Sequence, residues 1–218
     1  TSKVTTMAAV FKGSPFNKPI DDLDTSKVTS MISMFEGANQ FDQSIGSWDV
    51  SAVVNMSSMF KGANDFNGDI SGWNTHQVTS MHSMFQEAHV FNRDLSDWNT
   101  HQVTSMNSMF YNAHDFNQRI GKWDVSAVVD MSGMFYGGHD FNGDLSGWTT
   151  SNVTSMQSMF YDASSFNHPI ALWDVSAVTD MRDMLNGASS FNQSLYHWPI
   201  HFSDVEGFDP SSNIKVAN

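Results

Sequence analysis

Apolar residues recur along this chain with a fixed spacing of 25 positions. The repeat is easiest to follow in the segment 103–123, VTSMNSMFYNAHDFNQRIGKW, where Met106, Phe110, Phe116 and Trp123 have counterparts in the other copies. The tryptophans show the period without exception, at Trp48, Trp73, Trp98, Trp123, Trp148, Trp173 and Trp198. A fixed period of about 20 to 50 residues is typical of solenoids, propellers and arrays. The pattern therefore predicts a repeat protein.

The first half of the unit has the spacing of an amphipathic helix. Val103, Met106, Phe110 and Ala113 stand at i, i+3, i+7 and i+10, on one side of a helix with 3.6 residues per turn. The hydroxyl of Thr104 can accept a hydrogen bond at the helix start, and Gly, Asn and Asp gather after Ala113 and its counterparts. We expect a helix over 103–113 and its counterparts, with its apolar side in the core rather than in a cofactor site.

The second half of the unit has a different spacing. Ile120, Trp123 and Val125 follow the L-x-x-L-x-L outline of a leucine-rich repeat, in which a short parallel strand occupies the last x-L-x-L. Alternate side chains of a strand point to opposite faces, so Trp123 and Val125 should point inward while Lys122 and Asp124 point outward. We therefore expect one short parallel β-strand in each copy, around the tryptophan.

Together the two halves predict an α/β repeat solenoid of the leucine-rich-repeat type. It should have about eight 25-residue coils, each with one short parallel β-strand and one helix. Residues 1–205 should form this single solenoid domain, beginning with an irregular coil at 1–27 in which Leu23 replaces the tryptophan. The repeat decays after Trp198, and residues 206–218 are expected to form a C-terminal cap and tail.

A polar column follows the second phenylalanine of each unit. It consists of Asn17, Asp42, Asn67, Asn92, Asn117, Asn142, Asn167 and Asn192. The column adjoins phenylalanines that have to be buried, and buried polar groups need partners. We interpret it as an internal asparagine ladder that satisfies backbone groups of neighbouring coils, in preference to a row of ligand-binding residues.

The repeat wording F-N-x-x-I/L-x-x-W-D-V-S-x-V-T-x-M-x-x-M-F-x-x-A runs from Val4 to about Val205 and resembles that of the BspA-like leucine-rich-repeat surface proteins. The resemblance implies an extracellular or cell-surface protein of adhesion or recognition. Its partner would be a host or neighbouring-cell surface protein or glycan. The chain departs from the pattern at His76 and His101, where serine is usual. No signal or anchor segment is recognised, so we expect a mature form or an excised fragment.

The charge of the chain argues against one class of partner. There are 23 acidic and 10 basic residues, giving a net charge of −13. A protein that binds nucleic acid needs a basic stripe, and the Lys and Arg residues here are scattered. No apolar run approaches the ~20 residues of a membrane helix. We therefore expect neither a nucleic-acid partner nor a membrane-spanning segment in this chain.

The predicted binding surface is the outward face of the expected sheet, whose polar columns differ from copy to copy. Short polar side chains in register on such a face suit recognition of a glycan or an extended peptide, although a solvated face gives the same pattern. The densest group of hydrogen-bonding residues lies in three adjacent copies at the middle of the chain. The predicted ligand-binding residues are Asn74, His76, Asp97, Asn99, His101, Lys122 and Asp124.

Two alternatives to a recognition module remain open. His89, His114 and His139 occupy one column, and stacked about 4.8 Å apart they could share a metal ion. Other copies have Ser or Asn there, which favours surface variation at a turn. The chain could also be a spacer that holds another domain away from a surface. No catalytic motif and no set of unlike groups that breaks the repeat is visible, so neither an enzyme nor a cofactor is expected.

Overall fold

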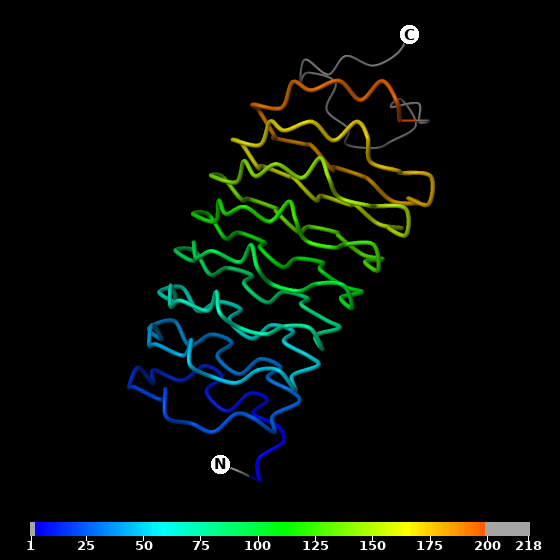
Figure 1. The fold of residues 1–218 in the computed structure, drawn as a ribbon. Helices are drawn as coiled ribbons and strands as arrows, with labels where there is room; N and C mark the ends of the chain where they lie inside the picture. The colour runs from blue at the N-terminus through cyan, green and yellow to red at the C-terminus, as the bar shows by residue number, and fades with distance from the viewer. Residues whose placement is uncertain (1–2, 199–218) are drawn as a thin grey trace.

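The structure is a computed structural model that describes residues 3–198. These residues form a stack of coils along one axis, and the chain runs from one end of the stack to the other (Figure 1). One residue of each coil takes part in a row of isolated parallel bridges, namely Thr6, Ser30, Asn55, Ser80, Ser105, Asp130, Ser155 and Asp180. No α-helix, and no strand longer than a single bridge, occurs within residues 3–198.

The predicted α/β architecture is therefore wrong, and the expected helix is the larger error. In residues 106–113 the backbone N–H groups do not close on the chain four residues back. Every second one donates to the next coil instead: Ser108 N donates to Ser132 O at 2.8 Å, and Phe110 N to Met134 O at 2.9 Å. The N–H groups between them close tight turns, as when Met109 N donates to Met106 O at 3.1 Å. The apolar residues at helical spacing do point inward, but they belong to consecutive turns and not to a helix.

This backbone alternation requires left-handed residues at two positions of every coil. The first column begins with Ala9, contains serine in most copies, and has φ between 52° and 59°. The second column lies four residues further on and consists of Gly13, Gly37, Gly62, Glu87, Asn112, Gly137, Asp162 and Gly187. Gly, Asn and Asp are the residues that adopt positive φ at least cost. A right-handed helix excludes positive φ at these positions, so the turns replace it.

The expected strand around each tryptophan is also absent. The parallel bridges occur at the residue before the first methionine, as at Ser105, and not at 123–125. Trp123 N closes a turn on Ile120 O at 3.1 Å, and Val128 N closes another on Val125 O at 2.9 Å. The predicted side-chain directions are nevertheless confirmed, because Trp123 and Val125 are buried while Asp124 is exposed.

Aromatic rings form the core in parallel columns. The first phenylalanines of successive coils, from Phe35 to Phe160, stack at 5.5 to 5.8 Å between ring centroids. The second phenylalanines, from Phe41 to Phe191, stack at 5.8 to 6.2 Å. Within a coil the two rings lie 3.8 to 4.0 Å apart. The predicted continuous core of Trp, Met and Phe is confirmed by their burial.

Buried polar groups connect neighbouring coils at fixed points. The indole N–H of every tryptophan donates to a backbone carbonyl of the preceding coil, as Trp123 does to Leu95 O at 2.9 Å. Where the valine of the Trp-x-Val triplet is replaced by threonine, the hydroxyl finds a carbonyl of the next coil, as Thr100 does at Asp124 O at 2.9 Å. No buried side-chain N or O atom within residues 3–198 lacks a partner.

The asparagine ladder is confirmed, but it lies at the surface and not inside. Asn117 Oδ1 accepts the backbone N–H of Asn142 at 2.9 Å. The equivalent bond joins each consecutive pair from Asn17 to Asn192. Asn117 and Asn142 are both exposed, so the ladder connects the coils along an outer edge.

The stack occupies residues 3–198, and the expected single domain over 1–205 stays a prediction. The predicted cap and tail at 206–218 lie outside the described residues. Among the residues that the structure describes, none forms a helix long and apolar enough to cross a membrane.

Truncation of Phe116 to alanine tests the core. The ring is fully buried and packs against Phe110 within its coil and against Phe91 and Phe141 in the adjacent coils. Its neighbours in a closely packed column have no room to refill the space, so the free energy of unfolding should fall by about 3–5 kcal/mol in urea titrations. Phe11→Ala, in the half-buried first coil, should cost less. A loss below about 1 kcal/mol for Phe116→Ala would contradict its burial.

Two substitutions in the second left-handed column separate the turns from a helix. Gly62→Ala should destabilise the fold by about 1–2 kcal/mol, because alanine is strained at the φ of +67° and the added Cβ meets no atom closer than 3.7 Å. Glu87→Gly should be neutral or stabilising by up to about 1 kcal/mol, because it removes the same strain at a φ of 59°. A helix would give the opposite signs, since glycine costs about 1 kcal/mol relative to alanine there. Urea midpoints of the two variants therefore distinguish the turns from a helix.

Candidate functional site

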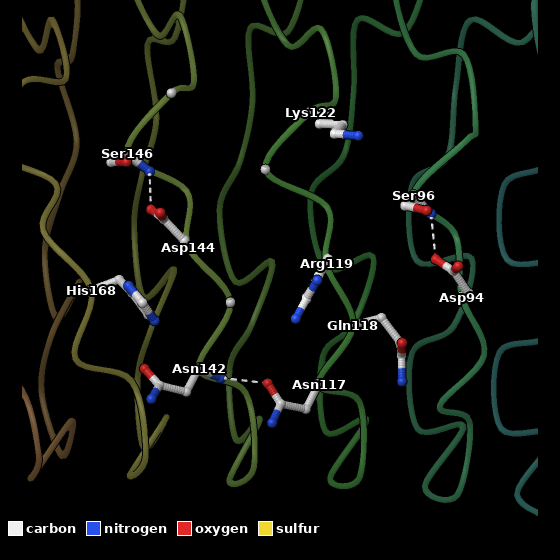
Figure 2. A pocket seen from close by; sticks show the side chains of 13 residues that line it. Asp94, Ser96, Asn117, Gln118, Arg119, Lys122, Asn142, Asp144, Ser146 and His168 are labelled. Carbon is white, nitrogen blue, oxygen red and sulfur yellow. Dashed lines mark hydrogen bonds between the residues drawn. The ribbon is translucent and has the colours of Figure 1, made fainter.

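The surface of the stack has a polar hollow of about 890 Å³ in its middle coils. Its lining comes from residues between Asp94 and His168 in neighbouring coils, and Figure 2 shows these side chains around the opening. Every lining residue is charged, polar or glycine. The hollow therefore offers hydrogen-bonding groups and is lined by no side chain of the apolar residue types.

Glycines stand in two columns of the lining, where most other coils bear side chains. Gly143 occupies the column of Gln118 and His168, and Gly147 occupies the column of Lys122 and Leu172. A Cβ at Gly147 would have only one neighbour within 4 Å, at 3.8 Å, so nothing but the absent side chain keeps this space open. The same glycine pair occurs at Gly68 and Gly72 outside the hollow, so the hollow is distinguished by Arg119 and Lys122 beside its glycines.

Two carboxylates stand in the hollow, each bound to the serine two residues on. Asp94 Oδ1 accepts the backbone N–H of Ser96 at 2.9 Å, and Asp144 Oδ1 accepts that of Ser146 at 2.9 Å. The hydrogen bonds from these serines lower the pKa of both carboxyl groups, and the nearby charges of Arg119 and His168 lower the pKa of Asp94 and Asp144 further. Both groups are therefore ionised acceptors at neutral pH.

Cationic and amide groups complete the site. Arg119 lies at the centre of the hollow, with Asp94 on one side of it and Asp144 on the other (Figure 2). Lys122 comes from the same coil, and both cations are exposed. Within residues 3–198 neither of them forms an ion pair with a carboxylate. Asn117 and Asn142, joined by the surface ladder, line one edge.

The residues predicted from the sequence lie, with one exception, outside the lining of this hollow. Asn74, Asp97, Asn99 and Asp124 are exposed, as expected of a binding surface. Of the predicted set, Lys122 alone lines the hollow. Sequence reasoning missed Arg119, Asp94 and Asp144, and the signal that could have found them is the single arginine between aspartates of one column.

Several of the predicted side chains are already hydrogen-bonded within their own turns. Asn74 Oδ1 lies 2.8 Å from His76 Nδ1, and Asn99 Oδ1 lies 2.5 Å from His101 Nδ1. Asp124 Oδ1 accepts both the backbone N–H and the hydroxyl of Ser126, which lowers the pKa of Asp124. These side chains stabilise the turn after the tryptophan. They retain exposed atoms, so their role in ligand binding stays a prediction.

The column of histidines is stacked as the sequence predicted. The ring centroids of His89 and His114 are 4.7 Å apart and nearly parallel, and those of His114 and His139 are 4.9 Å apart. Rings stacked face to face direct their nitrogens side by side and not toward a common point. No group of three or more His, Asp or Glu side chains within residues 3–198 is arranged to hold a metal ion.

The histidine stack predicts a dependence of stability on pH. Burial, together with the charges of His89 and His139, lowers the pKa of His114, while Asp115 and Asp140 oppose this shift. The unfolded chain then binds the proton more readily, so the contribution to stability is complete above about pH 6.5 and is lost as the pH falls through the folded pKa.

The test is His114→Asn, which introduces the residue that Asn39 and Asn64 supply in this column. Urea midpoints should fall between about pH 7.5 and 5.5 for the native chain and fall less for the variant. Parallel curves for the two proteins would contradict this role of the stack.

Comparison with known proteins agrees with the repeat architecture of the chain. A family model described as "Mycoplasma protein of unknown function, DUF285" matches residues 1–98 and 79–198. No curated protein matches the chain. Among solved structures, an internalin (inlF) from Listeria monocytogenes has a TM-score of 0.26 and 9% sequence identity over 77% of this chain and 57% of that chain, too low a likeness to support an argument. The family model spans nearly the whole length, and the chain therefore belongs to the family DUF285.

Proposed function

We propose that this protein is a non-catalytic recognition module, extracellular or on a cell surface, of the kind found in BspA-like surface proteins. It binds a glycan or a protein of a host or neighbouring cell. The observation that supports this proposal is the polar hollow between Asp94 and His168 in the middle of the stack. The regular coils hold its groups in fixed positions, and neighbouring coils supply unlike side chains to it.

The composition of the hollow favours binding over catalysis. A general acid at neutral pH needs a raised pKa. The pKa values of Asp94 and Asp144 are instead lowered by the serines beside them. Their hydrogen bonds orient them as acceptors, and Arg119 is available as a donor. Such a site selects a ligand by polar complementarity.

The exposed residues beside the hollow extend the proposed surface. Lys122 belongs both to the hollow and to the set predicted from the sequence. Asp97 lies one coil before it in the same column, and Asp124 and His101 are close enough for the histidine to lower the pKa of the aspartate. A ligand larger than the hollow would contact this second region. Its affinity should be modest, because exposed polar contacts replace bonds to water of similar strength.

A spacer that holds another domain away from a surface is the alternative that the elongated stack favours (Figure 1). A metal-dependent role for the histidine stack has less support, because the rings of His89, His114 and His139 present no convergent set of ligands. Spacer and recognition module differ in one measurable way, which is whether the isolated chain binds anything.

The test is an array of glycans and extracellular proteins probed with the whole chain and three variants. Gly147→Leu fills the hollow with the side chain that Leu172 supplies in the same column, and it should weaken binding by at least about tenfold, or roughly 1.4 kcal/mol. Gly72→Leu is the matched control, because Gly72 lies in the same column outside the hollow and a Cβ there meets nothing within 4 Å.

The third variant tests the second region. His76→Ser combined with His101→Ser preserves the turns, because Ser51 makes the equivalent bonds to Asp49. If the double variant loses binding and Gly147→Leu keeps it, the binding site lies outside the hollow. No ligand on the array at ~100 µM protein would contradict recognition and favour the spacer.

A further inference from the structure

We infer that the ligand of the hollow is a glycan whose bound sugar bears a single carboxylate, and that the guanidinium of Arg119 is its anchor. This inference rests on the proposed function and specifies the ligand of the same site. It is carried by three features of the hollow: an unpaired cation at its centre, flanking carboxylates, and a lining without apolar side chains.

The first feature is a reversal of charge within one column. The positions equivalent to Arg119 in the adjoining coils are Asp94 and Asp144, and one coil further away the position is Asp69. Arg119 therefore presents a positive charge in an acidic row, in a chain with a net charge of −13. It is exposed, and within the described part of the chain it forms no ion pair. A guanidinium has a planar fork of donors that matches a carboxylate with two parallel hydrogen bonds.

The second feature limits the charge of the ligand. Arg119 and Lys122 are accompanied in the hollow by Asp94 and Asp144, so the fixed charges of these four groups balance. A polyanion such as a nucleic acid or a heavily sulfated chain would meet the two carboxylates and be repelled. A ligand with one carboxylate can reach the guanidinium between them. Lys122, three residues further on in the same coil, adds a second donor.

The third feature identifies the rest of the ligand. A carboxylate accepts at about four sites, so the bond from Ser96 leaves Asp94 able to accept from further donors, and Asp144 is in the same position. Sugar hydroxyl groups are such donors, and they also accept from the amide groups of Asn117 and Gln118. These groups surround Arg119 in Figure 2. A ring with several hydroxyl groups and one carboxylate satisfies the whole set.

An acidic peptide offers the same carboxylate but fits the lining less well. Protein ligands gain most of their binding energy from aromatic and other large side chains in desolvated pockets. No apolar side chain lines the hollow, and Gly121, Gly143 and Gly147 leave bare backbone in its wall. A peptide would find a partner for its acidic side chain and none for its apolar residues. The observations therefore favour the sugar acid.

The experiment compares two chemically matched probes on the full chain by calorimetry or interferometry. The first probe is a neutral oligosaccharide that ends in one hexuronic acid residue, and the second is the same oligosaccharide with that carboxyl group reduced to a primary alcohol. The acidic probe should bind at least about tenfold more tightly, because loss of the carboxylate leaves Arg119 without its charged partner. A neutral peptide with a single glutamate serves as the third probe, and it should bind more weakly than the acidic oligosaccharide.

Variants of the anchor complete the experiment. Arg119→Gln should abolish the preference for the acidic probe, while Arg119→Lys should keep part of it, because an ammonium retains the charge without the planar fork. Arg93→Gln is the control: Arg93 is an exposed arginine outside the hollow that donates to Asn67 O, and its loss should leave the preference unchanged. Arg119 is exposed, so equal urea midpoints should show that each variant is folded.

The outcomes separate this inference from the proposed function. Equal affinity for the acidic and reduced probes would overturn the carboxylate anchor while leaving a glycan-binding module intact. If the preference for the acidic probe survives Arg119→Gln, another cation must bind the carboxylate. Tight binding of the single-glutamate peptide through Arg119, with no binding of either oligosaccharide, would replace the sugar acid by a peptide. Failure of all three probes together with a blank array would overturn both proposals.

Discussion

The alternation of backbone hydrogen bonds in the segment around 106–113 is the constraint on which the rest of the structure depends. One N–H group closes a tight turn within its coil, and the next donates to the following coil, as Ser108 does to Ser132. This alternation is sterically accessible only if a residue with positive φ stands at two positions of each coil. Without those residues the coil would have no ladder to its neighbour, and a single coil has too little core to be stable alone.

Once the coils are in register, equivalent side chains form columns through the whole stack. Phenylalanine and tryptophan rings stack inside, and asparagine carbonyls join the coils at the surface. The other exposed columns are free to vary because the backbone hydrogen bonds between coils do not depend on their side chains. Variation becomes a site where Gly147 and Arg119 occur in adjacent coils, because Gly147 leaves space in the hollow without disturbing the core. Fold and site thus use different positions of the same 25-residue unit.

The sequence predicted the period, the coils, the buried columns and the asparagine ladder, because burial and repetition leave direct traces in it. It did not predict the helix-free backbone. The inward positions Met106, Phe110 and Ala113 have helical spacing in either conformation, so periodicity alone could not separate a helix from consecutive turns. The decisive signal was a column of Gly, Asn and Asp, with Glu87 as its single exception. The hollow was missed because attention to polar side chains overlooks the positions where a side chain is absent.

A solution measurement of the hydrogen bonds themselves tests this account most directly. Scalar couplings across hydrogen bonds can be recorded by NMR on the deuterated chain for the segment around 106–113. The account predicts couplings from the amide of Ser108 to the carbonyl of Ser132 and from the amide of Phe110 to that of Met134. A coupling from the amide of Asn112 to the carbonyl of Ser108 would instead report an α-helix and would contradict the structure described here.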